Sequence, residues 1–391
     1  MAALAPSNLR SVLLAGAVLL SALTADAASL RDRVGVAHAG GKYGVAAGGR
    51  DYLGHGAQLA SDLGTRVIKL WLTRRPAGTY ALNSPLWPEG PLSNDLVSVA
   101  DHVYYRQVFS MPFTTIILVV DAHDDVWFGD GMSPVEESTE ERALHDLTRY
   151  LMKKYAGSGK TFILQNWEGD WLVRLNGATG TFSDRDPPDI AVNGMARWLN
   201  ARQRGVERAR NRLTSVTGVT VKHAVEVNHV WRAKYQPWRV SLTDDILPSV
   251  RADMYSYSAW ETGDDPSGER LKEMLTFLDA RTSGSGNIYV GEYGAPENVH
   301  GSAAHLGQVA AQTRAALDWG AAYVVYWQLF CNEFTADTPP PGYPAVLNQD
   351  MRGFWLLRPD GTRSPVWFFL RDLLAEPAEP VPGRRRAVRS R

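Results

Sequence analysis

The chain has 391 residues, of which 45% are hydrophobic and 21% are charged, and this is enough apolar mass for a large core. Its net charge of -1 excludes the excess of Lys and Arg with which nucleic-acid-binding proteins neutralise phosphates, so we expect no nucleic acid as partner. Cys331 is the only cysteine, which excludes an intrachain disulfide and leaves the fold to be held together by its core.

The first residues have the features of a secretory signal peptide. Arg10 precedes an apolar run at 11–23, and the sequence ADA at 25–27 forms an A-x-A cleavage pattern. The thirteen apolar or small residues of the run are too few to span a bilayer comfortably. We therefore expect residues 1–27 to be removed on export, no stable membrane anchor, and a secreted or periplasmic mature protein.

Eight short runs rich in β-branched and aromatic residues are predicted to be strands. Several of them are almost continuously apolar, which is typical of parallel strands buried on both faces. The strand candidates are residues 33–38, 65–72, 114–123, 161–168, 218–228, 252–258, 287–292 and 322–328.

The stretches between and after these runs are predicted to be helices, because their apolar residues recur three and four positions apart. Ser138 and Glu141 have the spacing of a capping box at the start of the third helix. The helix candidates are residues 52–63, 94–109, 138–156, 190–213, 242–250, 268–281, 302–319 and 364–374, of which 242–250 is short and weakly patterned.

Eight strands, each followed by a helix, predict an α/β fold with a single (β/α)8 TIM barrel over residues 28–375. An open doubly wound sheet is the alternative, but no G-x-G-x-x-G motif follows the first strand, which argues against its dinucleotide-binding form. Residues 376–391 are rich in Pro and Arg and are predicted to be a disordered tail.

In a barrel, the residues that carry the chemistry lie at the carboxyl ends of the strands. Glu168 and Glu292 belong to the fourth and seventh strands, so we expect their side chains to face each other across the barrel mouth. The chain also contains 13 Trp and 15 Tyr, and flat rings with polar edges suit the faces of sugars, although large cores use aromatic residues as well. The polar and aromatic residues at the strand ends are Lys69, Asp121, His123, Glu168, Asn228, His229, Tyr255, Tyr257, Glu292 and Trp327.

Four stretches resemble retaining glycoside hydrolases of clan A, a superfamily of cellulase-like TIM-barrel glycosidases. IYVGEYGAP resembles the clan's strand seven, DMYSYSAW its strand six, YVVYWQ its strand eight, and RPDGTRSPVWFFLRDLL its last turn and helix. The resemblance implies a barrel in which Glu168 is the acid/base and Glu292 is the nucleophile. It also implies that Tyr255 or Tyr257 bonds the nucleophile and that Trp327 forms a floor under the reacting sugar.

One position departs from the clan's pattern. Trp167 stands directly before Glu168, where the clan has an Asn that contacts the 2-hydroxyl group of the sugar. Asn166, which shares the face of Glu168 by strand alternation, or Asn228 could replace that contact, or the substrate lacks it. Asp170 remains a competing acid if the fourth strand ends later than expected.

These observations predict an exported glycosidase that cleaves O-glycosidic bonds of an oligo- or polysaccharide with retention, using two glutamates and neither metal nor cofactor. His123, in the sequence DAHDD, is a further candidate sugar contact, and capping of its strand is the other interpretation. Loops that carry Trp171, Trp260 and Trp355 favour an open cleft. Two alternatives stay open, namely a non-catalytic carbohydrate-binding barrel and a metal-dependent barrel hydrolase built on DAHDD. The sequence leaves the sugar, the linkage and the oligomeric state open.

Overall fold

The computed structural model describes residues 29–377, except for 45–48, 89, 94, 122–126, 177–178, 237–239, 283–286, 342 and 344. The predicted signal peptide and nearly all of the predicted tail lie outside these residues, so both stay predictions. None of the described helices is both long and apolar enough to cross a membrane.

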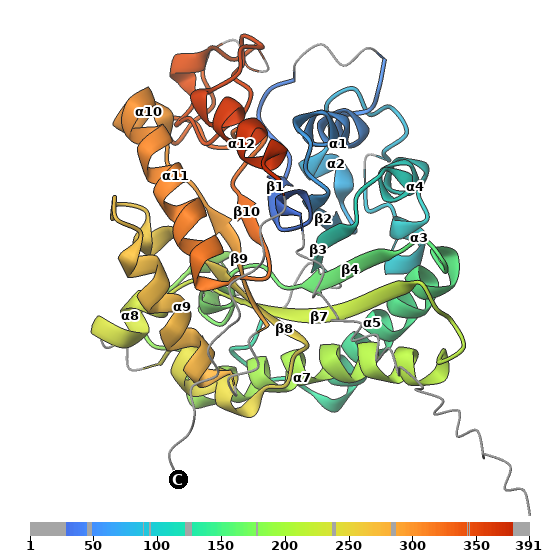
Figure 1. Cartoon of the computed structure of the whole chain (residues 1–391). Coiled ribbons are helices and arrows are strands. Elements are labelled where there is room, and N and C mark those ends of the chain that lie inside the picture. The colour runs from blue at the N-terminus through green and yellow to red at the C-terminus, as the bar shows by residue number, and fades with distance from the viewer. Residues whose placement is uncertain are drawn as a thin grey trace, which may run out of the picture.

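Eight parallel strands close into a barrel, which confirms the predicted (β/α)8 fold (Figure 1). Each strand overlaps one of the eight predicted runs. In their order around the barrel they are β1 (Val34–His38), β2 (Val67–Thr73), β3 (Thr115–Asp121), β4 (Lys160–Gln165), β7 (Val219–Val227), β8 (Met254–Ser258), β9 (Ile288–Tyr293) and β10 (Val324–Tyr326), which pairs with β1.

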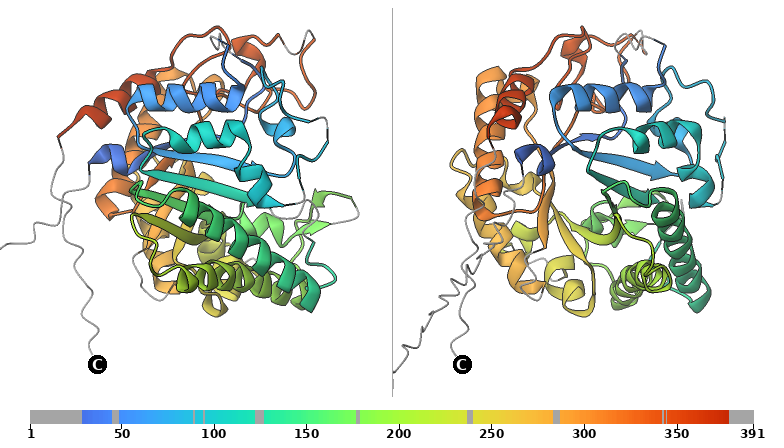
Figure 2. Two further views of the ribbon diagram at one scale, coloured as in Figure 1. Left: turned by 90° about the vertical axis from the view of Figure 1, so that its right-hand side faces the viewer. Right: turned by 45° about the vertical axis from the view of Figure 1, so that its right-hand side comes forward.

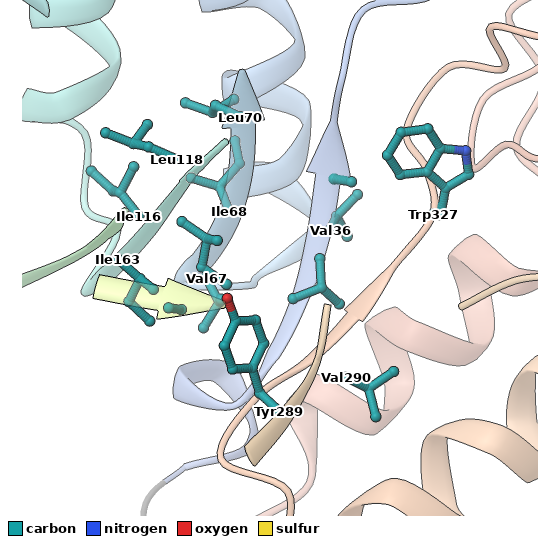
Figure 3. Close-up of a cluster of buried hydrophobic side chains, with 14 of the residues drawn as sticks. Val36, Val67, Ile68, Leu70, Ile116, Leu118, Ile163, Tyr289, Val290 and Trp327 are labelled. Carbon is teal, nitrogen blue, oxygen red and sulfur yellow. The ribbon is translucent and has the colours of Figure 1, made fainter. Parts of the chain in front are cut away.

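The apolar runs form strands because both of their faces are buried. Ile68, Leu70, Ile116 and Leu118 on β2 and β3 are fully buried, and Figure 3 shows them on these neighbouring strands. Trp327, the residue after β10, belongs to the same buried cluster and lies at its edge, at the carboxyl end of the barrel (Figure 3). The burial of alternate residues against the outer helices leaves the inner positions of the same strands free for the polar side chains of the site.

Helices surround the barrel on its outside (Figures 1 and 2). The longest, α5 and α7, lie side by side along one flank (Figure 2). The longer helices are α1 (Tyr52–Leu63), α4 (Val103–Ser110), α5 (Pro134–Lys154), α7 (Asp189–Arg212), α9 (Glu269–Arg281), α11 (Ser302–Trp319) and α12 (Pro365–Ala375).

Shorter elements connect these parts, several of them in the loops at the barrel mouth. A two-stranded hairpin follows β4, formed by β5 (Leu175–Asn176) and β6 (Thr181–Phe182). The short helices are η1 (Leu30–Asp32), α2 (Pro76–Thr79), α3 (Leu96–Ala100), α6 (Gly169–Leu172), α8 (Val230–Tyr235), η2 (Leu242–Ile246), η3 (Leu247–Ser249), η4 (Trp260–Thr262), α10 (Glu297–His300) and η5 (Asn348–Asp350).

Two predicted helices differ in their ends. The range 94–109 is divided into α3 and α4. The capping box predicted from Ser138 and Glu141 was wrong, because α5 begins four residues earlier, where Ser133 and Glu136 form the box and Pro134 occupies the first turn. Proline is favoured at that position because its fixed φ suits a helix start.

Candidate active site

The structure brings Glu168 and Glu292 together at the barrel mouth, as the sequence predicted. Glu168 follows β4 at the start of α6, and Glu292 lies on β9. The hydroxyl group of Ser258, the last residue of β8, lies 2.6 Å from Glu168 Oε1 and 3.1 Å from Glu292 Oε2. Both glutamates are buried, at 6% and 2% exposure. One hydroxyl group therefore joins two carboxyl groups that are almost withdrawn from solvent.

A register shift in β9 helps to direct Glu292 toward this meeting point. Tyr257 on β8 pairs with Val290, but Ser258 pairs with Glu292, so Gly291 is the extra residue of a bulge. Bulges re-aim side chains near active sites. A Cβ atom at Gly291 would lie 2.0 Å from Ser256 Oγ and 2.6 Å from Glu226 Oε2, so only glycine fits there.

Lys69 of β2 lies inside the barrel beneath Glu292 and is completely buried. Its ammonium group donates to Glu292 Oε1 at 2.8 Å and to Glu226 Oε2 at 2.9 Å. A third bond, at 3.3 Å, goes to the backbone carbonyl of Gly291. A buried ammonium group is stable only when it is paired, and here two carboxylates share it.

Glu226 of β7 is a third carboxylate of the site, which the sequence analysis missed. Besides the bond from Lys69, its carboxylate oxygens accept from Ser256 Oγ at 2.7 Å, from Gln165 Nε2 at 2.7 Å and from the backbone N–H of Glu168 at 3.3 Å. Glu226 therefore connects the cation to the backbone of the acid/base candidate. The signal was present in the sequence, since Glu226 is the single acid of the predicted run at 218–228, but attention to strand ends alone passed over it.

Burial and neighbouring charges raise the pKa of both glutamates at the barrel mouth. Burial raises the pKa of Glu168 well above its usual range, and the nearby carboxylate of Glu292 raises it further. Burial also raises the pKa of Glu292, to about 7, against the opposing effect of the Lys69 ammonium group. Burial lowers the pKa of Lys69, but Glu226 and Glu292 more than compensate and hold it above its usual value.

A hollow of about 360 Å³ opens onto the two glutamates and is walled by indole rings. Trp260 Nε1 donates to Glu168 Oε1 at 3.1 Å. The rings of Trp71 and Trp260 stand edge-on to that of Trp327, at centroid distances of 5.7 and 6.3 Å. The lining residues are Ala39, Trp71, Thr79, Trp167, Glu168, Trp260, Glu292, Trp327, Asn332 and Glu333.

The two candidate asparagines, Asn166 and Asn228, and the competing acid Asp170 bond to backbone groups rather than line the hollow. Asn166 accepts from the backbone N–H of Glu226 and donates to its carbonyl. Asn228 Oδ1 accepts from the backbone N–H of Asp170. The carboxylate of Asp170, fully buried, accepts from the backbone N–H groups of Asn228, His229 and Leu242. Of the two neighbouring acids, the structure therefore directs Glu168 to the hollow and uses Asp170 to fix loops.

Tyr255 and Tyr257 are not brought to the hollow. They alternate along β8 with Ser256 and Ser258, whose hydroxyl groups point into the barrel, so the tyrosines lie on the outer face. Both are buried, and Tyr255 donates weakly to the carbonyl of Val250. The partner of Glu292 on this strand is Ser258.

The remaining candidates divide. Trp327 lines the hollow, as expected. Trp355 does not belong to an open cleft, because it is buried and its indole N–H donates to Glu297. His123 and the rest of DAHDD after Asp121 lie outside the described residues. Within the described part of the chain, no three His, Cys, Asp or Glu side chains are grouped so as to hold a metal ion.

Comparisons with known proteins support the fold. No protein-family model and no curated protein matches the sequence. A GH5_18 protein from Streptomyces cattleya, in complex with Manβ1-4GlcNAc, is 13% identical with a TM-score of 0.58, over 88% of this chain and 82% of that chain. An exo-β-1,4-mannosidase from Opitutaceae bacterium strain TAV5 is 15% identical with a TM-score of 0.53, over 88% of this chain and 59% of that chain.

A family 39 glycoside hydrolase from Bacteroides cellulosilyticus WH2 is also similar, at 12% identity and a TM-score of 0.52, over 88% of this chain and 64% of that chain. At these identities the likeness shows a shared barrel fold. This is the fold that the resemblance to clan A implied.

Proposed function

We propose that the chain is an exported, retaining glycosidase that cleaves an oligo- or polysaccharide with Glu168 as acid/base and Glu292 as nucleophile. The observation that carries the proposal is the pair of buried glutamates joined by Ser258 in a hollow walled by indole rings. Two hydrogen bonds to one oxygen bring the carboxyl groups within reach of the roughly 5–5.5 Å separation that retaining hydrolysis needs.

The first step forms a glycosyl-enzyme. Glu292, ionised, attacks the anomeric carbon through one oxygen, while the bond from that carbon to the leaving oxygen breaks. Glu168, protonated, gives its proton to the leaving oxygen and becomes a carboxylate. The assignment of roles is supported by Lys69, whose ammonium group bonds Glu292 and stabilises its anionic form.

The second step hydrolyses the glycosyl-enzyme. A water molecule attacks the anomeric carbon, Glu168 takes its proton, and the bond to Glu292 breaks, which restores both groups. Ser258 has a single proton to donate, and hydrogen bonds to charged acceptors are the stronger ones. It therefore donates to Glu292 before the first step and to Glu168 while Glu292 is esterified.

A β-linked mannoside is the first substrate to test. The barrels of similar fold include an exo-β-1,4-mannosidase and a GH5_18 protein that binds Manβ1-4GlcNAc. Trp167 lines the hollow at the position where the clan has the Asn that contacts the 2-hydroxyl group of the sugar. This supports a substrate contact at that position that differs from the clan's. Export is supported by the apolar run and the ADA pattern before residue 28, and the N-terminal sequence of the secreted protein would test it.

The test is hydrolysis of β-1,4-mannan, xylan and cellulose, with the first-formed anomer followed by NMR, for wild type, Glu168→Ala and Glu292→Ala. We expect a retained anomer from wild type and at least a thousandfold loss in both variants, about 4 kcal/mol of barrier. An aryl glycoside distinguishes the roles, because its leaving group needs no acid. Glu168→Ala should then form the glycosyl-enzyme and accumulate it, whereas Glu292→Ala should form none.

Two outcomes would contradict the proposal. Hydrolysis that survives both substitutions would show that other residues carry the reaction. Binding of a polysaccharide without any cleavage would favour the non-catalytic carbohydrate-binding barrel. Lys69 bonds Glu292 and favours its ionised form, whereas burial and the charge of Glu292 raise the pKa of Glu168 and favour its protonated form, which argues against that alternative, because a binding site has no use for one protonated and one ionised carboxyl group.

A further inference from the structure

A groove leads away from the catalytic hollow over η4, α8 and α9. Trp260 lines both the catalytic hollow and a second one of about 640 Å³. Trp231, Gln236 and Arg270 line this second hollow and also a third, of about 710 Å³, which ends at Tyr235. The shared residues place the three hollows next to one another, and α8 and α9, which contribute residues to the outer part, lie side by side (Figure 1).

The groove begins on the side of the acid/base candidate. The indole N–H of Trp260 donates to Glu168 Oε1, and Trp260 also lines the second hollow. Under the proposed function, Glu168 protonates the leaving oxygen. The part of a substrate that continues past Trp260 is therefore the part that carries the leaving group.

The groove is held in a fixed shape by Glu261, the residue after Trp260. Its carboxylate accepts from the backbone N–H of Trp231 at 2.9 Å and from His229 Nδ1 at 2.9 Å. This ties η4 to the start of α8, so that the two indole rings keep their relative positions. A preorganised surface loses little free energy to ordering when a ligand binds.

The chemistry of the groove suits a neutral sugar. Trp231 and Tyr235 present neighbouring rings, with centroids 5.7 Å apart. The arginines of the lining are paired with carboxylates: Arg232 with Glu261, Arg270 with Asp264, and Arg352 with Glu333. Glu269 and Glu273 add further negative charge to the outer part. Among the described residues that line the groove, these pairs leave no excess positive charge to attract a uronate, sulfate or phosphate group.

We propose that this groove is a binding site for the leaving-group part of a neutral oligosaccharide, with Trp231 as its central stacking surface. The proposal rests on the proposed function, because the leaving-group side is defined by Glu168. It means that the enzyme recognises several sugar units on the reducing-end side of the scissile bond and prefers chains to small glycosides.

The experiment compares Trp231→Ala with wild type on β-1,4-mannohexaose and on 4-nitrophenyl β-mannoside, or on the matching pair from whichever polysaccharide the wild type cleaves. We expect the ratio of kcat/KM for the hexaose to kcat/KM for the aryl glycoside to fall about tenfold or more, as for buried Trp anchors in other interfaces. Trp231→Phe should restore most of the ratio. Trp319→Ala is the matched control, since Trp319 ends α11 at the opposite end of the barrel and bonds Thr276 there.

A hexaose labelled at its reducing end tests the direction. Wild type should leave several units on the labelled fragment, and Trp231→Ala should move the preferred cut toward the label. A ratio that does not change, or a cut that moves away from the label, would overturn the groove proposal while the glycosidase stands. A wild type that cleaves no glycoside in the panel would overturn the proposed function and the groove with it.

Discussion

Two fully buried ion pairs lie on opposite faces of the same barrel wall, and they have different roles. Outside the barrel, Arg202 of α7 bonds Glu140 of α5 at 2.7 Å and the carbonyl groups of Val120 and Gln165. Inside it, Lys69 bonds Glu226 and Glu292. The two networks meet at Gln165, whose carbonyl group accepts from Arg202 and whose side chain donates to Glu226.

The difference between the pairs lies in charge balance and access. Among the described residues, Arg202 pairs with the carboxylate of Glu140, and its guanidinium group also lies 4.5 Å from the ring of Trp198. Around Lys69, the described residues place one cation among three carboxylates, two of which open to the hollow. Balanced charge gives a static brace, whereas an excess of carboxylate raises pKa values and leaves a proton to transfer.

The largest expected effect is a loss of activity that follows from a change in the inner network but not from the same change in the outer ion pair. Glu292→Gln removes the nucleophile while nearly keeping its shape, so kcat/KM should fall at least about a thousandfold, or 4 kcal/mol of barrier. The matched change Glu140→Gln should leave the activity per folded molecule near that of wild type. Steady-state kcat/KM, with circular dichroism to establish that each variant is folded, measures both. Comparable losses in the two variants would contradict the division between a catalytic and a bracing pair.

The outer ion pair, Arg202 with Glu140, is expected to affect the stability of the fold rather than the activity. Arg202→Met removes a cation that pairs with the buried Glu140, so the free energy of unfolding should drop by about 3–5 kcal/mol. The double variant Arg202→Met with Glu140→Leu removes both charges and should recover much of that loss. Urea unfolding of the three proteins measures this cycle. A double variant that is less stable than Arg202→Met alone would show that the pair stabilises the fold in its own right.

The inner network is expected to set the pH dependence of activity. The nucleophile must be ionised, and its pKa is raised to about 7, so kcat/KM should fall as the pH drops below about 7. Lys69→Met removes the cation that opposes this shift, which should move the acid limb to higher pH by about 1–3 units. Glu226→Gln removes a negative charge that raises the pKa of Glu292, so its limb should move to lower pH.

Opposite shifts are the test of this interpretation, because a merely structural role would lower activity without moving the limb. Lys69→Arg is the control that keeps the charge. If the profiles of Lys69→Met and Glu226→Gln move in the same direction, the network does not act through the charge on Glu292.

The sequence was sufficient to predict the strands and the position of Glu168 and Glu292 at the barrel mouth, because apolar runs and strand ends are local patterns. The partners of the glutamates depend on register and on pairing across the barrel. The strand β8 shows this dependence. Its sequence MYSYS is equally compatible with tyrosines or with serines on the inner face, and only the packing of the sheet places Ser256 and Ser258 inside. The bulge at Gly291 likewise breaks strict alternation, and the role of Glu226 depends on Lys69 from a strand far away in the chain.

The smallest expected effect concerns Ser258, the hydroxyl group that links the two glutamates. Ser258→Ala removes one hydrogen bond to whichever carboxylate is charged, and such bonds contribute about 1.5–3 kcal/mol. We therefore expect kcat/KM to fall about ten- to a hundredfold, with the acid limb moving to higher pH because Glu292 loses a donor to its anionic form. Ser258→Thr keeps the hydroxyl group and should retain most of the activity. Because the hydroxyl group acts in both steps in turn, formation and hydrolysis of the glycosyl-enzyme should slow together. Stopped-flow measurements with an aryl glycoside follow both steps. Slowing of one step alone would show that Ser258 assists a single glutamate.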